Sequence, residues 1–250
     1  MQVSLFTFAI AAAAFLTAML SGIAGVGGGT ILIGIFYAIG LAPAQAVPLH
    51  ASVQLVSNAS RTIAYFRSVE WRAIGWFLLG TVPAPLLVAP YVAAVNPHLI
   101  ELVLAGMILM SMLPATEHRA LLPLRWAYLL AGVLNGSIGM FVGATGLFIG
   151  KLFLRPEWRK ETMIGTLALC QFIGHLMKII GFASIGFDPL HQPELLWPLL
   201  AAVILGTLAG KQLNQRLSEE HFRRLVNGIL LVMALKLLWD GFDALVFKGT

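Results

Sequence analysis

The first apolar segment of the chain contains the stretch Gly22-Ile23-Ala24-Gly25-Val26-Gly27-Gly28-Gly29. A glycine inside a helix costs about 1 kcal/mol of helix propensity relative to alanine, so this stretch predicts a break in the helix. A second apolar segment, in the other half of the chain, is interrupted by Gly139-Met140-Phe141-Val142-Gly143-Ala144-Thr145-Gly146. Each half of the chain is therefore expected to contain one broken helix.

A polar triplet follows each break, on the next apolar segment. The triplets are Gln54, Asn58 and Arg61 in the first half, and Gln171, His175 and Lys178 in the second. Both have the spacing i, i+4, i+7, which places three side chains on one face of a helix. Each residue of the second triplet lies 117 positions after its counterpart (171 − 54, 175 − 58 and 178 − 61). This predicts two homologous repeats, at about residues 1–115 and about residues 124–250.

The composition predicts an integral membrane protein. Hydrophobic residues make up 59% of the 250 and charged residues 11%, with a mean hydropathy of +0.88. A soluble domain has about 25% charged residues. The apolar runs do not alternate as barrel strands do, so the expected fold is an all-α polytopic protein, one domain over 1–250, in the cell (inner or plasma) membrane. The net charge of +5 comes from basic residues in short loops, which orient a protein in a bilayer and do not indicate nucleic acid binding.

About eight hydrophobic segments follow from the hydropathy pattern. They lie at about 4–40, 44–66, 74–95, 99–113, 126–154, 162–187, 195–213 and 225–246. The first segment is too long for one crossing, since a straight helix over it would extend roughly 55 Å, against about 30 Å for the hydrocarbon core. The first and fifth segments are therefore expected to be broken at their glycines.

The basic residues predict the orientation of the repeats. They form four clusters: Arg67/Arg72, Arg119/Arg125, Lys151/Arg155/Arg159/Lys160 and Lys211/Arg216/Arg223/Arg224. All four lie on the cytoplasmic side if each glycine-broken segment crosses an even number of times. Each half then has an odd number of crossings, so the halves are inverted repeats and both termini lie outside the cytoplasm. Lys236 and Lys248 weigh slightly against this orientation.

The glycine breaks are candidate anion-binding elements. A helix that begins at a break presents free N–H groups and its positive end to an anion, as in transporters with discontinuous helices. The candidate residues are Gly27, Gly28, Gly29, Gly143 and Thr145. The alternative is close helix packing, for which Gly25 and Gly29 have the GxxxG spacing. The first stretch lacks the Lys-Ser/Thr of a P-loop, which argues against nucleotide binding.

The two triplets are candidate substrate-binding residues. Charge at mid-bilayer costs at least about 2.5–3.5 kcal/mol, so these polar faces are expected to point into the helix bundle. Lys178 lies well inside its segment and is the stronger candidate, whereas Arg61 also fits a residue that snorkels to the membrane surface. His175 is a candidate proton carrier because histidine has an ordinary pKa of about 6.5. Alternatively, it is satisfied by a neighbouring helix.

Carboxylates are few in the apolar segments, and this indicates the sign of the substrate. Glu101 and Asp240 lie near predicted helix ends, where an interfacial position is expected. A cation pump usually needs buried Asp or Glu. A small anion is therefore the predicted substrate, with protons as the candidate coupling ion. No metal site, cofactor or catalytic residue is predicted.

At these residues the sequence resembles the TauE/SafE family of membrane transporters, exporters of sulfite and organosulfonates. The resemblance covers most of the chain and rests on the first glycine stretch, on Val142-Gly143-Ala144-Thr145-Gly146, and on Thr166 with the second triplet. Two features depart from the family pattern. No proline follows either glycine stretch, and the Thr-Ser element of the family stands here as Ala51-Ser52 and Gly165-Thr166. The resemblance implies secondary transport of sulfite or an organosulfonate.

Two other functions remain open at this point. A membrane-embedded hydrolase would use Ser137 or Ser57 as nucleophile and a histidine as base, but the sequence has no nucleophile elbow and no evident orienting carboxylate. A non-transporting scaffold would bury its polar faces against a partner. The sequence leaves the oligomeric state open.

Overall fold

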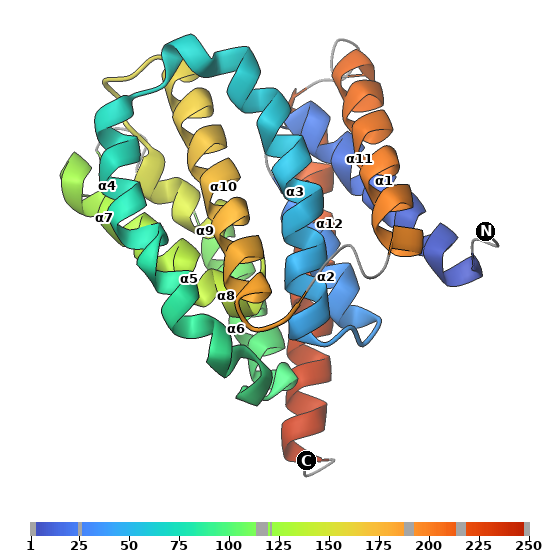
Figure 1. The fold of residues 1–250 in the computed structure, drawn as a ribbon. Helices are drawn as coiled ribbons and strands as arrows, with labels where there is room; N and C mark the ends of the chain where they lie inside the picture. Colours follow the sequence, from blue (N-terminus) through green and yellow to red (C-terminus); the bar gives the residue numbers. More distant parts are fainter. Residues whose placement is uncertain are drawn as a thin grey trace.

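The computed structural model describes residues 4–24, 27–113, 120, 122–187, 193–213 and 219–247. Every regular element in these ranges is a helix (Figure 1). Three helical stretches among the described residues are long and apolar enough to cross a membrane, namely Trp71–Ala94, Lys160–Ala183 and Pro193–Gly210. The all-helical class predicted from the composition is confirmed.

The first half of the chain contains α1 (Leu5–Ala24), α2 (Gly28–Ala38), α3 (Pro43–Tyr65), η1 (Phe66–Ser68), α4 (Trp71–Thr81), α5 (Pro83–Val88), η2 (Ala89–Ala94) and α6 (Pro97–Met112). The first apolar segment is thus two helices, α1 and α2, which meet at the glycine stretch. The segment expected at 74–95 is divided into α4, α5 and η2. Pro83 and Pro90 explain this division, because proline lacks the N–H that continues a helix.

The second half contains α7 (Leu124–Gly136), α8 (Ile138–Val142), α9 (Gly146–Ile149), η3 (Gly150–Phe153), α10 (Lys160–Ala183), α11 (Pro193–Leu213) and α12 (Glu219–Val246). The fifth apolar segment is thus divided into α7, α8, α9 and η3. Gly25 and Val26 of the first break lie outside the described residues, as do most of the junction expected at 114–125 and the loop at 188–192.

Helices α3 and α10 lie side by side and run in opposite directions (Figure 1). At one end of the pair, a Cβ atom on Gly165 would lie 2.8 Å from the carbonyl oxygen of Tyr65. Further along, the ring centroids of His50 and His175 are 5.6 Å apart. Around this pair, α1 packs against α11, α4 against α7, and α6 against α12.

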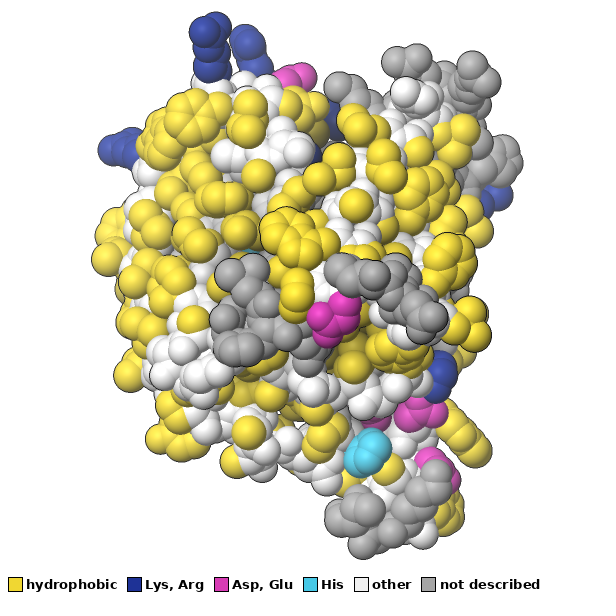
Figure 2. Space-filling view, turned by 45° about the vertical axis from the view of Figure 1, so that its right-hand side comes forward, with side chains coloured by type: hydrophobic (Ala, Val, Ile, Leu, Met, Phe, Trp, Pro, Cys, Tyr) yellow, Lys and Arg dark blue, Asp and Glu magenta, His cyan; other side chains and the backbone are white. Residues whose placement is uncertain are grey.

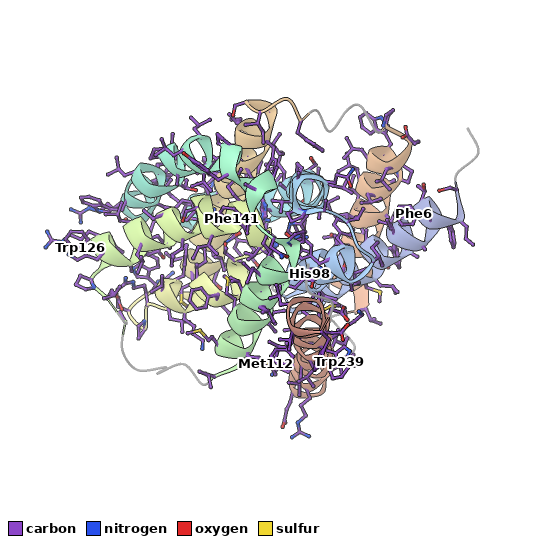
Figure 3. The ribbon with its side chains drawn as sticks, turned by 90° about the horizontal axis from the view of Figure 1, so that it is seen from below. Phe6, His98, Met112, Trp126, Phe141 and Trp239 are labelled. Carbon is purple, nitrogen blue, oxygen red and sulfur yellow. The ribbon has the colours of Figure 1, made fainter. Side chains whose placement is uncertain are left out.

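The outer surface of the bundle is apolar. Hydrophobic side chains cover most of the face in Figure 2. Phe6, Trp126 and Trp239 lie at the periphery in Figure 3, and all three are exposed. Buried residues include many polar ones, such as Asn135 and Lys178. An apolar outside around a partly polar inside is the arrangement that a lipid environment favours.

Glycines bring the outer helix pairs into close contact. A Cβ atom on Gly206 of α11 would lie 2.2 Å from the carbonyl oxygen of Phe15 in α1, and one on Gly132 of α7 would lie 2.2 Å from that of Phe77 in α4. No side chain fits at such distances without separating the backbones. Small residues at membrane helix crossings allow this close approach.

Gly206→Ala is therefore expected to lower the free energy of unfolding by about 1–3 kcal/mol, the usual cost of overpacking. Gly228→Ala on α12 is the matched control, because a Cβ atom there meets nothing within 4 Å. Unfolding of the detergent-purified protein by heat or denaturant measures both. Equal stability of the Gly206 variant and the wild type would contradict the packing of α1 against α11.

Candidate functional site

A central cavity lies where the glycine breaks meet α3 and α10. Its volume is about 60 Å³. Most of the residues predicted from the sequence line it: Gly27, Gly29, Gln54, Asn58, Arg61, Gln171 and His175. The lining also contains Ser21, Thr30, His50, Ala144, Gly146, Leu147 and Leu167. Of the other candidates, Gly28, Gly143, Thr145 and Lys178 do not line it.

The two breaks place their glycines in matching positions. A Cβ atom on Gly29 would lie 2.9 Å from the side-chain amide of Gln54, and one on Gly146 would lie 3.6 Å from that of Gln171. Gly146 follows Gly29 by the same 117 positions (146 − 29) that separate the two glutamines. Each break therefore brings its backbone against the glutamine of its own half.

Positive φ angles mark both breaks. Gly27, which precedes α2, has φ +100°, and Gly143, which ends α8, has φ +77°. Residues with a Cβ atom rarely adopt this region. Gly28 serves helix packing, because a Cβ atom there would lie 1.9 Å from the carbonyl oxygen of Thr17 in α1. Backbone reversal and close packing thus both contribute to the first break.

The α3 face carries a chain of hydrogen bonds that orients Arg61. Arg61 Nη2 donates to Asn58 Oδ1 at 3.0 Å, and Asn58 Nδ2 donates to the carbonyl oxygen of Gln54 at 2.9 Å. Arg61 belongs to the cavity lining. Arg61 is therefore oriented within the bundle and does not simply mark a helix end.

His50 is a cavity residue that the candidate set from the sequence omitted. It is 1% exposed, and its Nε2 donates to the carbonyl oxygen of Gly29 at 2.8 Å. Because His50 lies four residues before Gln54, the helical spacing of the first triplet, extended one turn towards the N-terminus, would have included it.

Several buried polar atoms of the cavity lining have no protein partner. They are Nδ1 of His50, Nε2 of Gln171 and Nδ1 of His175. All three side chains are at least nine-tenths buried. An unpaired buried polar group costs about 1–3 kcal/mol, so such groups are normally satisfied by a ligand or water. Their convergence on one cavity is what a binding site for a small polar molecule requires.

Lys178 belongs to a different cluster, at the second break. Its Nζ donates to the carbonyl oxygen of Gly143 at 2.8 Å and to Asn135 Oδ1 at 3.2 Å. Thr145 Oγ1 also donates to Asn135 Oδ1, at 2.8 Å. Lys178 is fully buried. These contacts join α10 to the break between α8 and α9.

The residues at the equivalent positions of the first half explain why Arg61 does not make the same contacts as Lys178. Subtracting 117 from the numbers of Asn135 and Lys178 gives Ala18 and Arg61. Ala18 offers no acceptor, so a basic side chain on α3 cannot make the contact that Lys178 makes on α10. In the first half, Arg61 lines the cavity. In the second half, Lys178 donates to the backbone carbonyl oxygen of Gly143.

The described residues contain no group of three or more His, Cys, Asp or Glu side chains that could bind a metal ion. The nucleophile candidate Ser137 donates its hydroxyl to the carbonyl oxygen of Val133 in its own helix at 2.6 Å. Neither Ser57 nor Ser137 lines the cavity.

Asn135→Ala is expected to lower the free energy of unfolding by about 1–3 kcal/mol, because it leaves Lys178 and Thr145 without their shared acceptor. Lys178→Met removes the other partner of the same contact. A double-mutant cycle with these two substitutions should give a coupling energy of about 0.5–3 kcal/mol in denaturant unfolding. Strictly additive effects would contradict the contact between Lys178 and Asn135.

Comparison with known proteins identifies the family. The family model described as sulfite exporter TauE/SafE matches residues 10–237. A probable sulfite/organosulfonate exporter TauE of Cupriavidus necator is 24% identical over 233 residues, which cover 90% of each chain. No solved structure matches the chain. The protein belongs to the TauE/SafE sulfite exporter family of multi-pass membrane transporters.

Proposed function

We propose that the protein is a secondary transporter of a small oxyanion, sulfite or an organosulfonate, which binds in the central cavity between two repeats. The observation that carries the proposal is the set of buried, unpartnered polar atoms of His50, Gln171 and His175 beside Arg61. Families of anion transporters place such groups near the middle of the membrane. The named activity of the Cupriavidus necator relative supports the same class of substrate.

The charges around the cavity favour an anion. Arg61 contributes a cation, and the described lining residues include no Asp or Glu. Guanidinium groups bind oxyanions through several N–H donors in a fixed plane. The amide groups of Gln54, Asn58 and Gln171 add neutral donors, so an oxyanion can replace its hydration shell on entering.

The cavity volume favours a small substrate. One water molecule needs about 10–15 Å³ of cavity volume. A cavity of about 60 Å³ therefore has room for about four to six water molecules. Sulfite has four non-hydrogen atoms and methanesulfonate has five. Larger sulfonates require the cavity to open further in another state of the transport cycle.

The pairing of helices supports two repeats, at about 1–115 and 124–250. Exchanging α1 with α7, α3 with α10, α4 with α11 and α6 with α12 converts every main helix pair into itself or into another observed pair. The pair α1–α11 becomes α7–α4, while α3–α10 and α6–α12 become themselves. A two-fold axis has this effect. Since α3 and α10 are antiparallel, the axis runs across the bundle, as it does for inverted repeats in a membrane.

The positions of the loops support a common cytoplasmic end. The backbone N–H of Glu70 donates to Thr166 Oγ1 at 3.0 Å, which joins the end of α3 to the beginning of α10. Arg155 Nη1 donates to the carbonyl oxygen of Leu122 at 2.7 Å, at the beginning of α7. Most Lys and Arg side chains visible in Figure 2 lie towards the upper end. Basic loops at one end indicate the cytoplasm.

Arg61→Gln is expected to reduce sulfite uptake into proteoliposomes at least tenfold. A hydrogen bond from a charged group contributes about 1.5–3 kcal/mol, and about 1.4 kcal/mol corresponds to a factor of ten. Arg61→Lys should retain part of the activity, because it keeps the charge and loses the planar donor set. Arg67→Gln, at an exposed site outside the cavity, is the control.

The uptake assay compares sulfite, methanesulfonate and acetate, with and without a pH gradient. Wild-type rates in Arg61→Gln would contradict the proposed role of Arg61. A wild-type protein that transports none of the anions would contradict the proposed function.

Cysteine labelling tests the inverted arrangement in a Cys170→Ala background. Cysteines introduced at Arg67 and Glu157 should react with an impermeant maleimide from the cytoplasmic side. Cysteines at Ala94 and Ile185, near the opposite ends of their helices, should react from the other side. All four positions are exposed. Reaction of positions 67 and 157 from opposite sides would rule out the inverted repeats.

A further inference from the structure

The ring of His50 is fixed in one orientation by the backbone of the first break. Its Nε2 lies 2.8 Å from the carbonyl oxygen of Gly29. A carbonyl oxygen only accepts hydrogen bonds, so Nε2 must carry a hydrogen. In the neutral ring, Nδ1 then carries a lone pair and acts as an acceptor. This Nδ1 is buried and has no protein partner.

An acceptor at this position opposes an anion in the cavity. Arg61 and Nε2 of Gln171 in the lining are donors and suit an oxyanion. Adding a proton to Nδ1 of His50 converts this acceptor into a charged donor. The hydrogen bond to Gly29 is unaffected, because both ring nitrogens donate in the protonated form.

We propose that His50 takes up one proton from solution at Nδ1 when the cavity binds its oxyanion, so that the proton and the anion occupy the site together. The proposal rests on the proposed function and adds the proton-binding residue. It places the proton on the residue that contacts the break between α1 and α2, rather than on His175, the candidate proton carrier from the sequence.

The charges near His50 make the anion the natural counterion of the proton. The described buried titratable groups on helices packed against α3 are Tyr37 of α2, with its hydroxyl bonded to the carbonyl oxygen of Phe141, and Cys170, His175 and Lys178 of α10. Arg61 lies on α3 itself. The other described ionisable groups on these elements are at the exposed surface, among them Arg67, Tyr91, Lys160, Glu161 and Glu194.

None of the described buried groups that face His50 is a carboxylate. A proton on His50 therefore adds to existing positive charge until an anion enters. By linkage, the anion must increase the affinity of the site for the proton by the same factor as the proton increases its affinity for the anion.

His50 is better suited to the proton than His175. The charge of Lys178 acts on both rings, but Arg61 and His50 also act on His175. His175 lies on α10, three residues before Lys178, and therefore faces more positive charge. A hydrogen bond to the carbonyl oxygen of Gly29 orients the ring of His50.

Calorimetric titration of the purified wild-type protein with methanesulfonate tests the proposal. This anion does not itself take up a proton near neutral pH, so any proton must bind to the protein. Titrations in buffers of different ionisation enthalpy give the number of protons taken up per anion bound. We expect up to one proton, and an affinity that falls about tenfold per pH unit above the range in which His50 titrates.

His50→Gln is the test variant, because its side-chain amide can donate to Gly29 and still present an acceptor, yet cannot titrate. Its binding of methanesulfonate should be weak, independent of pH and without proton uptake. His98→Gln is the control, since His98 is partly exposed, pairs with Glu101 and lies outside the cavity. It should retain the wild-type proton uptake.

The outcomes separate the two proposals. Wild-type binding without proton uptake at any pH overturns the proton site and leaves the anion site standing. Proton uptake that persists in His50→Gln overturns the assignment to His50. If the wild type binds neither methanesulfonate nor sulfite at any pH, the anion site itself is wrong. The wild-type titration tests the coupled proton uptake even if His50→Gln does not fold.

Discussion

Two helices of this protein are broken inside an apolar bundle, and the backbone groups at each break must find partners without bulk water. An unsatisfied backbone group in a lipid environment costs several kcal/mol. Side chains of the two central helices contact the backbone beside each break. His50 of α3 donates to the carbonyl oxygen of Gly29, and Lys178 of α10 donates to that of Gly143. These two bonds tie the breaks to α3 and α10, which also line the central cavity.

The two halves use the same construction for different purposes. In the second half, Asn135 joins Lys178 and Thr145, so that the break is fixed by side chains from α7, from α10 and from the break itself. In the first half, Ala18 and Gly28 stand at the positions of Asn135 and Thr145. The basic residue of that half is Arg61, which lines the cavity. The second half therefore uses its basic residue to fix a break, whereas the basic residue of the first half lies at the cavity.

Much of this arrangement could be predicted from the sequence, because glycine breaks and helical spacing are local signals. The two triplets share their spacing and their offset of 117, and most of their residues line one cavity. The contact of Lys178 with Asn135 could not be predicted from the sequence, because Asn135 comes from another helix. The division of the third segment was missed, although Pro83 and Pro90 signal it locally. The helical spacing also places His50 on the face of Gln54, but its contact with Gly29 could not be predicted from the sequence.

The central claim is that the cavity between α3 and α10 binds a small oxyanion. Selenite has the geometry of sulfite and scatters anomalously, so its position in crystals of the protein tests the claim directly. The account predicts one anomalous peak in the cavity, within hydrogen-bond reach of Arg61, His50 and Gln171. A selenite peak at Lys178 and the Gly143 break with an empty cavity, or binding only at the outer surface, would contradict it.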